Sequence, residues 1–557
     1  MSTALTGSHR RVIVASSLGT VFEWYDFFLY GSLAAIISKQ FFAGVNEITG
    51  FIFALAAFAA GFAVRPFGAI VFGRLGDLVG RKRTFLMTIL IMGISTALVG
   101  LLPTQAQIGV AAPILLVLLR LLQGFAIGGE YGGAAVYVAE HAPEGKRGLY
   151  TSWIQTTATV GLMLSLVVIL GCRAVLGAEA FEAWGWRIPF LLSVVLLGFS
   201  VYIRLQLEES PVFRQMQDEG RLAKAPLKEA FGKWKNLKLV LLVLFGASAG
   251  QAVIWYCGQF YSLFFLTQVL KVAAEPANLL VAGSLLLGTP FFVIFGALSD
   301  RIGRKPIVMA GLALALVLYF PLFKGLTHFA NPAIDAAATS SPITVVADPD
   351  ACNLQFDPVG KTRFTTSCDV VKSVLAKAGV PYDNEAAARG ALAHVLIGAQ
   401  RIESFEGGAL PAAEFAARSA AFGNAVKTAL TAAGYPASSD SSQINYPMVL
   451  LMLTVLVILA TMVYGPIAAW MVELFPPRIR YTSLSLPYHI GNGWFGGFLP
   501  TVSFALVALT GDIYYGLWYP LVIAGASLVI GMLFLPGSVV HDEADAYDDR
   551  AAAPTNP

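Results

Sequence analysis

The sequence has few charged residues, since Asp, Glu, Lys and Arg together make up 13% of its 557 residues. A soluble domain carries roughly 25%, whereas here hydrophobic residues reach 57% and the mean hydropathy is +0.70. This imbalance indicates a polytopic membrane protein. The net charge of +3 is too small and too dispersed to favour a nucleic-acid partner.

The sequence also lacks motifs for catalysis and metal binding. It contains no phosphate-binding loop, metal-ligand cluster or nucleophile motif, and the stretch 348–352 (DPDAC) lacks the spacing of a calcium loop. Its four cysteines are too few for a disulfide framework across the whole chain. We therefore expect a protein that is not an enzyme and that holds no metal or cofactor.

A charged loop motif occurs twice. Residues Gly73 to Arg83 read GRLGDLVGRKR, and Gly296 to Pro306 read GALSDRIGRKP, each between two long apolar segments. The sequence Tyr-Thr-Ser at 150–152 returns at 481–483, with a wider separation than the loop motif has. These repeats predict two similar halves of a membrane protein, the second of which carries an insertion.

Twelve apolar runs are long enough to span a bilayer as helices. We place them at 12–37, 50–72, 84–103, 111–138, 149–171, 187–205, 238–268, 276–297, 306–325, 447–471, 482–508 and 513–535. The expected organisation is an N-terminal six-helix bundle (1–205), a central loop (206–237), a second six-helix bundle (238–325 and 447–535), an insert (326–446) and a tail (536–557).

Basic residues predict the orientation of these helices. They gather in the loops after helices 2, 4, 8 and 10 and in 206–237, whereas the loops near 40–49, 104–110 and 509–512 have almost none. The run from Val12 is too long for a signal peptide. We expect both termini, the central loop and the tail in the cytoplasm, and the insert on the extracytoplasmic face between helices 9 and 10.

The insert contains signs of its own small fold. The stretch 341–349 (SPITVVADP) predicts a strand, and 385–401 and 412–433 predict helices. Cys352 and Cys368 both lie in the insert, in the compartment where a disulfide persists, and we expect them to pair. Cys172 and Cys257 lie in or beside helices and are expected to be small buried apolar groups.

With this pattern in place, the sequence resembles a major facilitator superfamily transporter. The loop motif matches that superfamily's loop between helices 2 and 3. Four further stretches resemble its metabolite:proton symporter family: 19–31 (GTVFEWYDFFLYG), 65–76 (RPFGAIVFGRLG), 120–140 (RLLQGFAIGGEYGGAAVYVAE) and 184–190 (WGWRIPF). The resemblance covers all of the chain except the insert. It implies two six-helix bundles that expose a central site alternately to either side of the membrane.

Ionisable groups inside membrane helices are costly and by default functional. We predict proton coupling by Asp26 first and Glu23 second; either carboxyl could instead only hydrogen-bond a neighbouring helix. The resemblance pairs Arg120 with Asp26. Arg65 suits the capture of a carboxylate, although pairing with Glu23 is an alternative that the sequence leaves open. The candidate substrate-binding residues are Arg65, Arg120, Tyr30, Gln123, Tyr131, Gln251, Trp255, Tyr256, His489 and Asn492.

The loop motif is expected to act as a gate. The resemblance implies that Gly73 allows close packing against helix 11 and that a charge network breaks when the inner side opens. The candidate gating residues are Gly73, Asp77, Arg81, Asp300 and Arg304. A simpler reading is that these charges only fix topology. For Glu130, within GGEYGG, close packing through glycine is the alternative to a functional role.

The leading functional prediction is proton-coupled symport of an organic acid anion, such as a dicarboxylate, tricarboxylate, keto acid or shikimate-like acid. A zwitterionic osmolyte such as proline or betaine is the alternative, weakened because the short tail after Leu535 carries no heptad repeat. A non-transporting membrane receptor is a remote alternative. The expected partners are a small substrate, a proton and the bilayer, for a monomer in the bacterial inner membrane.

Overall fold

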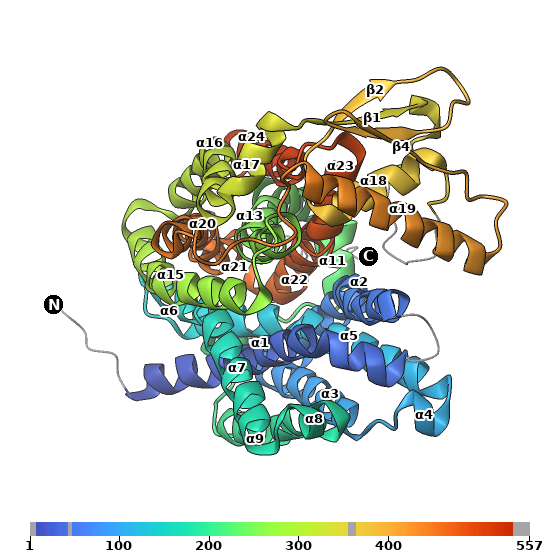
Figure 1. Cartoon of the computed structure of the whole chain (residues 1–557). Coiled ribbons are helices and arrows are strands. Elements are labelled where there is room, and N and C mark those ends of the chain that lie inside the picture. The colour runs from blue at the N-terminus through green and yellow to red at the C-terminus, as the bar shows by residue number, and fades with distance from the viewer. Residues whose placement is uncertain (1–6, 43–46, 355–363, 539–557) are drawn as a thin grey trace, which may run out of the picture.

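The computed structural model describes residues 7–42, 47–354 and 364–538. Twelve membrane-length helical runs form two halves (Figure 1). The N-terminal half contains α1 (Gly7–Phe41), α2 (Glu47–Val79), α3 (Arg81–Leu101), α5 (Ala111–His141), α6 with α7 (Arg147–Gln155 and Thr157–Leu176) and α9 (Arg187–Leu205). Short helices α4 (Gln105–Ile108), α8 (Ala178–Ala180) and η1 (Phe181–Gly185) join them.

The C-terminal half contains the other six runs. The first is made of α12 (Trp234–Val243), η2 (Leu244–Ser248), α13 (Ala249–Tyr256), η3 (Cys257–Tyr261), α14 (Ser262–Phe264) and η4 (Phe265–Val269). It is followed by α15 (Ala274–Ile302), α16 (Arg304–Ala330), α20 with α21 (Tyr446–Tyr464 and Ile467–Leu474), α22 with η7 and α23 (Arg480–Ile490, Gly491–Gly496 and Leu499–Thr510) and α24 (Trp518–Phe534). The short helices η6 (Pro477–Ile479) and η8 (Tyr515–Leu517) precede α22 and α24, and α10 (Pro211–Asp218) and α11 (Pro226–Gly232) lie between the halves.

Ten of these runs are long and apolar enough to cross a membrane within the described residues. The remaining two are α1 and α2, of 35 and 33 residues, which carry the charged side chains discussed below. The fold class predicted from the sequence, an all-α membrane protein of two six-helix bundles, is therefore confirmed. Most of the expected tail, 539–557, lies outside the described residues.

Glycine ends the helix at the same point of each charged loop motif. Gly80 separates α2 from α3 with φ 110°, and Gly303 separates α15 from α16 with φ 94°. Residues with a Cβ rarely adopt this backbone conformation, so glycine permits the sharp reversal there. Each reversal sets the charged end of one helix directly before the start of the next.

The insert folds around a four-stranded sheet with the order β2-β1-β3-β4, seen at the top of Figure 1. Strand β1 pairs parallel to β2 and antiparallel to β3, and β3 pairs antiparallel to β4. The elements are α17 (Pro332–Ser340), β1 (Ile343–Ala347), η5 (Pro349–Ala351), α18 (Ser367–Ala378), β2 (Asp383–Ala386), β3 (His394–Ile397), β4 (Gln400–Glu403) and α19 (Ala412–Ala432). The predicted strand at 341–349 and helix at 412–433 are confirmed.

The predicted helix at 385–401 is wrong, because this stretch contains the end of β2, all of β3 and the start of β4. Strand β3 alternates half-buried and buried side chains, with Val395 and Ile397 facing the core. Gly398 follows with φ 56° in a two-residue turn before Gln400. A glycine with positive φ at the first position of such a turn favours a tight β-hairpin over a continuous helix.

The insert hydrogen-bonds to the last carbonyls of α23. Lys372 Nζ donates to the Leu509 carbonyl at 2.6 Å, the Tyr382 amide donates to Gly511 at 3.1 Å, and the Tyr382 hydroxyl donates to Ala508. Burial lowers the pKa of the Lys372 ammonium. Since the final carbonyls of a helix have no partner inside it, these donors fix the insert on one end of the C-terminal half.

Cys352 and Cys368 form a disulfide that closes a loop of the insert, 16 residues apart in sequence. A crosslink over such a loop stabilises the folded state by about 3 kcal/mol, mainly by restricting the unfolded chain. Replacing both cysteines by serine should lower the unfolding free energy of the insert by about that amount. Hydrogen exchange of α18 and β1 amides in the full-length protein measures it; Cys172→Ser is the control, and equal protection in both variants would contradict the prediction.

Candidate functional site

Two buried ion pairs lie inside the N-terminal half. Arg120 of α5 contacts Asp26 of α1 at 3.0 Å, and Arg65 of α2 faces Glu23 of α1 at 3.8 Å. All four residues are less than 9% exposed. The first contact is a charge-assisted hydrogen bond, whereas the second is a looser electrostatic contact. The structure thus brings together both carboxyls of α1 and both arginines that the sequence placed in membrane helices.

Further polar groups hold the Arg120–Asp26 pair. Gln123 accepts from Arg120 at 2.5 Å and donates to Asp26 at 3.3 Å and to Thr96 at 2.9 Å. The Arg120 guanidinium lies 4.2 Å from the ring centre of Tyr30. Such a network orients the guanidinium, so Arg120, Asp26, Gln123 and Tyr30 act as one unit.

Glycines let α5 approach α2 closely around these pairs. A Cβ at Gly128 would lie 2.3 Å from the Arg65 carbonyl oxygen, and one at Gly124 would lie 2.0 Å from that of Gly61. Small residues permit this approach between membrane helices. Asp26, Phe62, Arg65, Arg120 and Gln123 line a cavity of about 10 Å³ beside the pairs, which is room for about one water molecule. The space beside the ion pairs is therefore small in this structure.

Aromatic side chains of both halves meet next to the ion pairs. The rings of Tyr131 (α5) and Tyr488 (α22) stack with centres 3.7 Å apart, and Trp24 (α1) contacts Trp255 (α13) at 4.9 Å. Of these four, sequence analysis named Tyr131 and Trp255 and missed the other two. Tyrosine or tryptophan in an apolar helix is ordinarily a packing residue, so only the assembled interface distinguishes them.

Hydrogen bonds link this aromatic cluster to two more residues that sequence analysis missed. The hydroxyls of Tyr464 and Tyr488 lie 2.6 Å apart, and Gln155 donates to the Tyr131 hydroxyl at 2.7 Å. The Tyr256 ring contacts Phe62 at 6.2 Å across the two halves. The predicted residue Tyr256 therefore does lie at the interface between the halves.

The remaining predicted residues of the C-terminal half are buried beside the aromatic cluster. Gln251 and Asn492 hydrogen-bond each other, with Asn492 Nδ2 donating to Gln251 Oε1 at 3.2 Å. His489, one turn before Asn492, is 1% exposed. These side chains come from α13, α22 and η7, which pack together near α2.

Glu130 belongs to a separate pair that sequence analysis missed. Its carboxylate contacts Arg204 of α9 at 2.5 Å and accepts from Thr88 at 2.8 Å. The neighbouring Gly129 also packs tightly, since a Cβ there would lie 2.4 Å from Phe72. Arg204 comes from the last turn of α9, where an arginine is ordinarily interpreted as reaching for the membrane surface.

The two loop motifs connect the halves in matching ways. Asp77 accepts from the amides of Tyr481 and Thr482 at 3.3 and 2.9 Å, and Asp300 accepts from those of Gly148 and Leu149, both at 2.8 Å. In each case the donors are the second and third residues of a helix in the opposite half, α22 or α6. A helix N-terminus has unpaired amides and favours negative charge.

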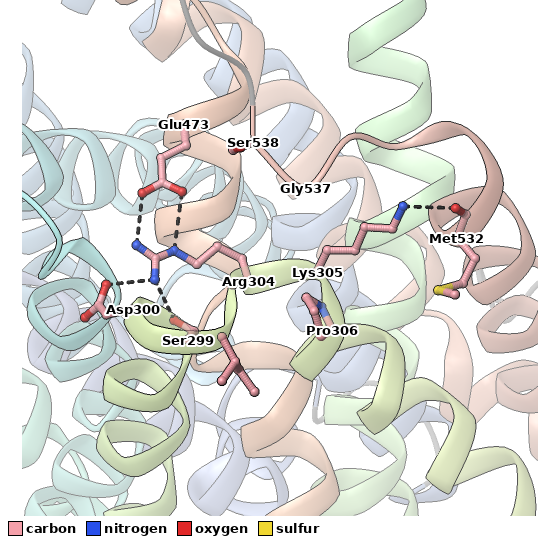
Figure 2. Close-up of a pocket in the computed structure, with 11 residues that line it drawn as sticks. Ser299, Asp300, Arg304, Lys305, Pro306, Glu473, Met532, Gly537 and Ser538 are labelled. Carbon is pink, nitrogen blue, oxygen red and sulfur yellow. Dashed lines mark hydrogen bonds and ion pairs between the residues drawn. The ribbon is translucent and has the colours of Figure 1, made fainter.

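Arginines surround both contacts. Arg81 lies 3.3 Å from Asp77, while Arg304 lies 2.7 Å from Asp300 and 3.0 Å from Glu473 (Figure 2). Glycine shapes the first contact, since a Cβ at Gly73 would lie 2.9 Å from Thr482 Cα. An open pocket of about 550 Å³ lies beside Arg304 and Lys305 (Figure 2), and its lining includes none of the residues of the central ion pairs. All five predicted gating residues thus lie at this end of the protein.

Glu140 adds a link between the halves that sequence analysis missed. Its carboxylate contacts Arg480 of α22 at 3.0 Å and Arg81 at 3.5 Å, and it accepts from the Ser210 hydroxyl. Glu140 stands near the end of α5, beside a basic loop, where the sequence alone offers no sign of its partner.

Two six-helix halves joined around buried charges define a membrane transporter of the major facilitator fold. The solved proton:xylose symporter XylE has the same fold, with a TM-score of 0.59 at 15% identity over 96% of this chain and 98% of that one. Residues 12–346 match the model of the "Sugar (and other) transporter" family. The chain belongs to this family.

Curated relatives align over part of the chain. The glycine betaine/proline/ectoine/pipecolic acid transporter OusA of Dickeya dadantii is 38% identical over 328 residues, which are 57% of this chain and 64% of that protein. The shikimate transporter of Escherichia coli is 39% identical over 323 residues, 57% of this chain and 72% of that protein. The chain therefore spans a little under two thirds of OusA's length, and its relatives' substrates are diverse.

Proposed function

We propose that this protein is a proton-coupled symporter of a small carboxylate-bearing metabolite, most simply an organic acid anion, and that its halves expose the central site alternately. The observation that carries this proposal is the pair of buried arginines, each facing a carboxylate of α1. Buried charges in membrane helices are costly, so they indicate a role in binding or coupling. Asp26, Glu23 and Arg120 are the proposed coupling residues, and Arg65 binds the substrate carboxylate.

In this geometry, proton binding and substrate binding both involve Arg65. Arg65 faces Glu23 at 3.8 Å, beyond hydrogen-bond distance, so a substrate carboxylate could approach more closely. Protonation of Glu23 removes the negative charge opposite Arg65 and leaves the guanidinium to the substrate. Because two arginines face two carboxylates, the site is neutral when both acids are ionised. Each proton that binds then allows the site to accept one negative charge of the substrate and stay neutral.

A zwitterion such as betaine or proline is the second candidate. The neutral charge sum of the site favours it, and OusA carries a name of that class. A receptor that does not transport is the third candidate. The inner-membrane location, the cytoplasmic termini and the extracytoplasmic insert belong to this proposal.

Uptake into proteoliposomes tests the proposal. We expect an imposed inward proton gradient to drive uptake of one or more of 2-oxoglutarate, citrate and shikimate, with betaine and proline as the competing class. Arg65→Lys keeps the charge but loses the bidentate fork, so it should raise the KM by about tenfold with a smaller change in kcat. Uptake of betaine or proline alone would select the second candidate, and no uptake at all would contradict transport.

A further inference from the structure

Four buried side chains, three of them beside the central site and the fourth one helical turn further along, carry polar atoms with no hydrogen-bond partner among the described residues. These atoms are Arg65 Nε, Trp255 Nε1, both amide atoms of Gln259 and both ring nitrogens of His489. Their residues are 8%, 1%, 3% and 1% exposed, respectively. Buried polar groups in native proteins are nearly always paired, and the cavity lined by Arg65 has room for only about one water molecule. Three of these residues lie beside one site and Gln259 lies one helical turn away, so their unpaired atoms are available to a ligand there.

Contacts place three of these side chains around the interface between the halves. Arg65 lies 4.2 Å from the ring centre of Phe62, Phe62 contacts Tyr256, and Tyr256 contacts its neighbour Trp255 at 5.0 Å. Trp255 contacts Tyr464 at 5.9 Å, and Tyr464 hydrogen-bonds Tyr488, which adjoins His489. Gln259 follows Trp255 by one turn of the same helical run.

The unpaired atoms have a definite hydrogen-bonding character. Arg65 and Trp255 can only donate, whereas Gln259 and His489 can both donate and accept. A carboxylate satisfies Arg65, because its oxygens only accept. Pairing Gln259 and His489 as well takes ligand oxygens that accept and ligand hydroxyls that donate.

We propose that Trp255, Gln259 and His489 form a second polar subsite beside Arg65, and that the substrate is a carboxylate with additional hydroxyl or carbonyl oxygens. This inference rests on the proposed function and selects among its candidates. Betaine carries no hydrogen-bond donor and no acceptor beyond its carboxylate, so it would leave most of these atoms unpaired. A site built to hydrogen-bond a substrate strongly rejects an analogue that lacks the matching group.

The arrangement of the aromatic rings also argues against a quaternary ammonium substrate such as betaine. Tyr131 and Tyr488 stack on each other with an interplanar angle of 5°, and Trp24 packs on Trp255. A cage for a quaternary ammonium presents open aromatic faces to the cation. Here the faces of Tyr131 and Tyr488 cover each other, while the polar edges of Trp255 and His489 remain unpaired.

Two acids of equal ring size test the subsite: shikimate, and cyclohexene-1-carboxylate, which lacks the three hydroxyls. We expect the wild-type protein to prefer shikimate by about 100-fold in kcat/KM. Gln259→Leu and His489→Phe should reduce that ratio towards one, because both acids then meet similar contacts. Ser527→Ala, which removes a buried unpaired hydroxyl of α24 that is not part of the proposed subsite, should keep the ratio.

The outcomes separate the two proposals. Equal uptake of both acids by the wild-type protein, or an unchanged ratio in both variants, would overturn the subsite while leaving carboxylate symport intact. Uptake of betaine with rejection of both acids would overturn the substrate class. Absence of any driven uptake would overturn the proposed function itself. Melting curves with and without each acid confirm that a variant is folded and show whether it still binds.

Discussion

Asp26→Asn should reduce proton-driven accumulation of substrate to the level of protein-free liposomes. An asparagine cannot exchange a proton, yet it keeps the size of the side chain and one oxygen that can accept from Arg120. The 3.0 Å contact with Arg120 and the links through Gln123 make this carboxyl the best-connected acid of the site. If proton binding at Asp26 drives the cycle, accumulation stops while substrate exchange without a gradient continues.

Folding must be separated from coupling in this experiment. Removing one partner of a buried pair costs about 3–5 kcal/mol, because the other charge remains unpaired. The double variant Asp26→Asn with Arg120→Gln removes both charges, so it should regain stability without regaining accumulation. Lys39→Gln disrupts an exposed pair with Glu182 and should change neither quantity. Normal accumulation by the folded Asp26→Asn variant would exclude Asp26 as the coupling residue and leave Glu23 as the other candidate.

The sequence was informative where a residue type is rare in its setting. A charged side chain in a membrane helix is conspicuous, so Asp26, Glu23, Arg65 and Arg120 could be selected before the structure. The repeated loop motif located Asp77 and Asp300 in the same way. The structure adds which groups meet. For Arg65 it shows Glu23 opposite the guanidinium at 3.8 Å, the pairing that the sequence left open beside the capture of a substrate carboxylate.

Residues of common types could not be predicted. Tyr464, Tyr488 and Gln155 lie in helices rich in apolar and small residues, and their importance depends on how each helix is rotated about its axis. That rotation is set by packing against helices distant in sequence, as the contact of Tyr131 with Tyr488 shows. The hairpin around Gly398 was missed for a related reason: an alanine-rich stretch favours helix locally, whereas pairing of β3 with β1 decides the fold.

Replacing both Asp77 and Asp300 by asparagine should open the charged-loop end of the protein. Each carboxylate accepts two backbone amides from a helix of the opposite half, and each lies beside an arginine of its own motif. A hydrogen bond to a charged group contributes about 1.5–3 kcal/mol. Loss of one such bond at each contact therefore favours separation of the halves by roughly 3–6 kcal/mol, and 5.5 kcal/mol suffices to convert a 1:99 equilibrium into 99:1.

Spin labels on the exposed positions Arg83 and Arg301, one in each half, report this opening as a longer distance. The double variant should populate the longer distance. Each single variant should show a smaller shift, because the aspartate of the other loop motif still accepts its two backbone amides. Asp350→Asn, which removes an exposed carboxylate paired with Arg389 in the insert, should leave the distance unchanged. Transport should slow in the double variant with little change in exchange affinity, since the central pairs are untouched. An unaltered distance would mean that Glu140, between Arg81 and Arg480, holds this end closed on its own.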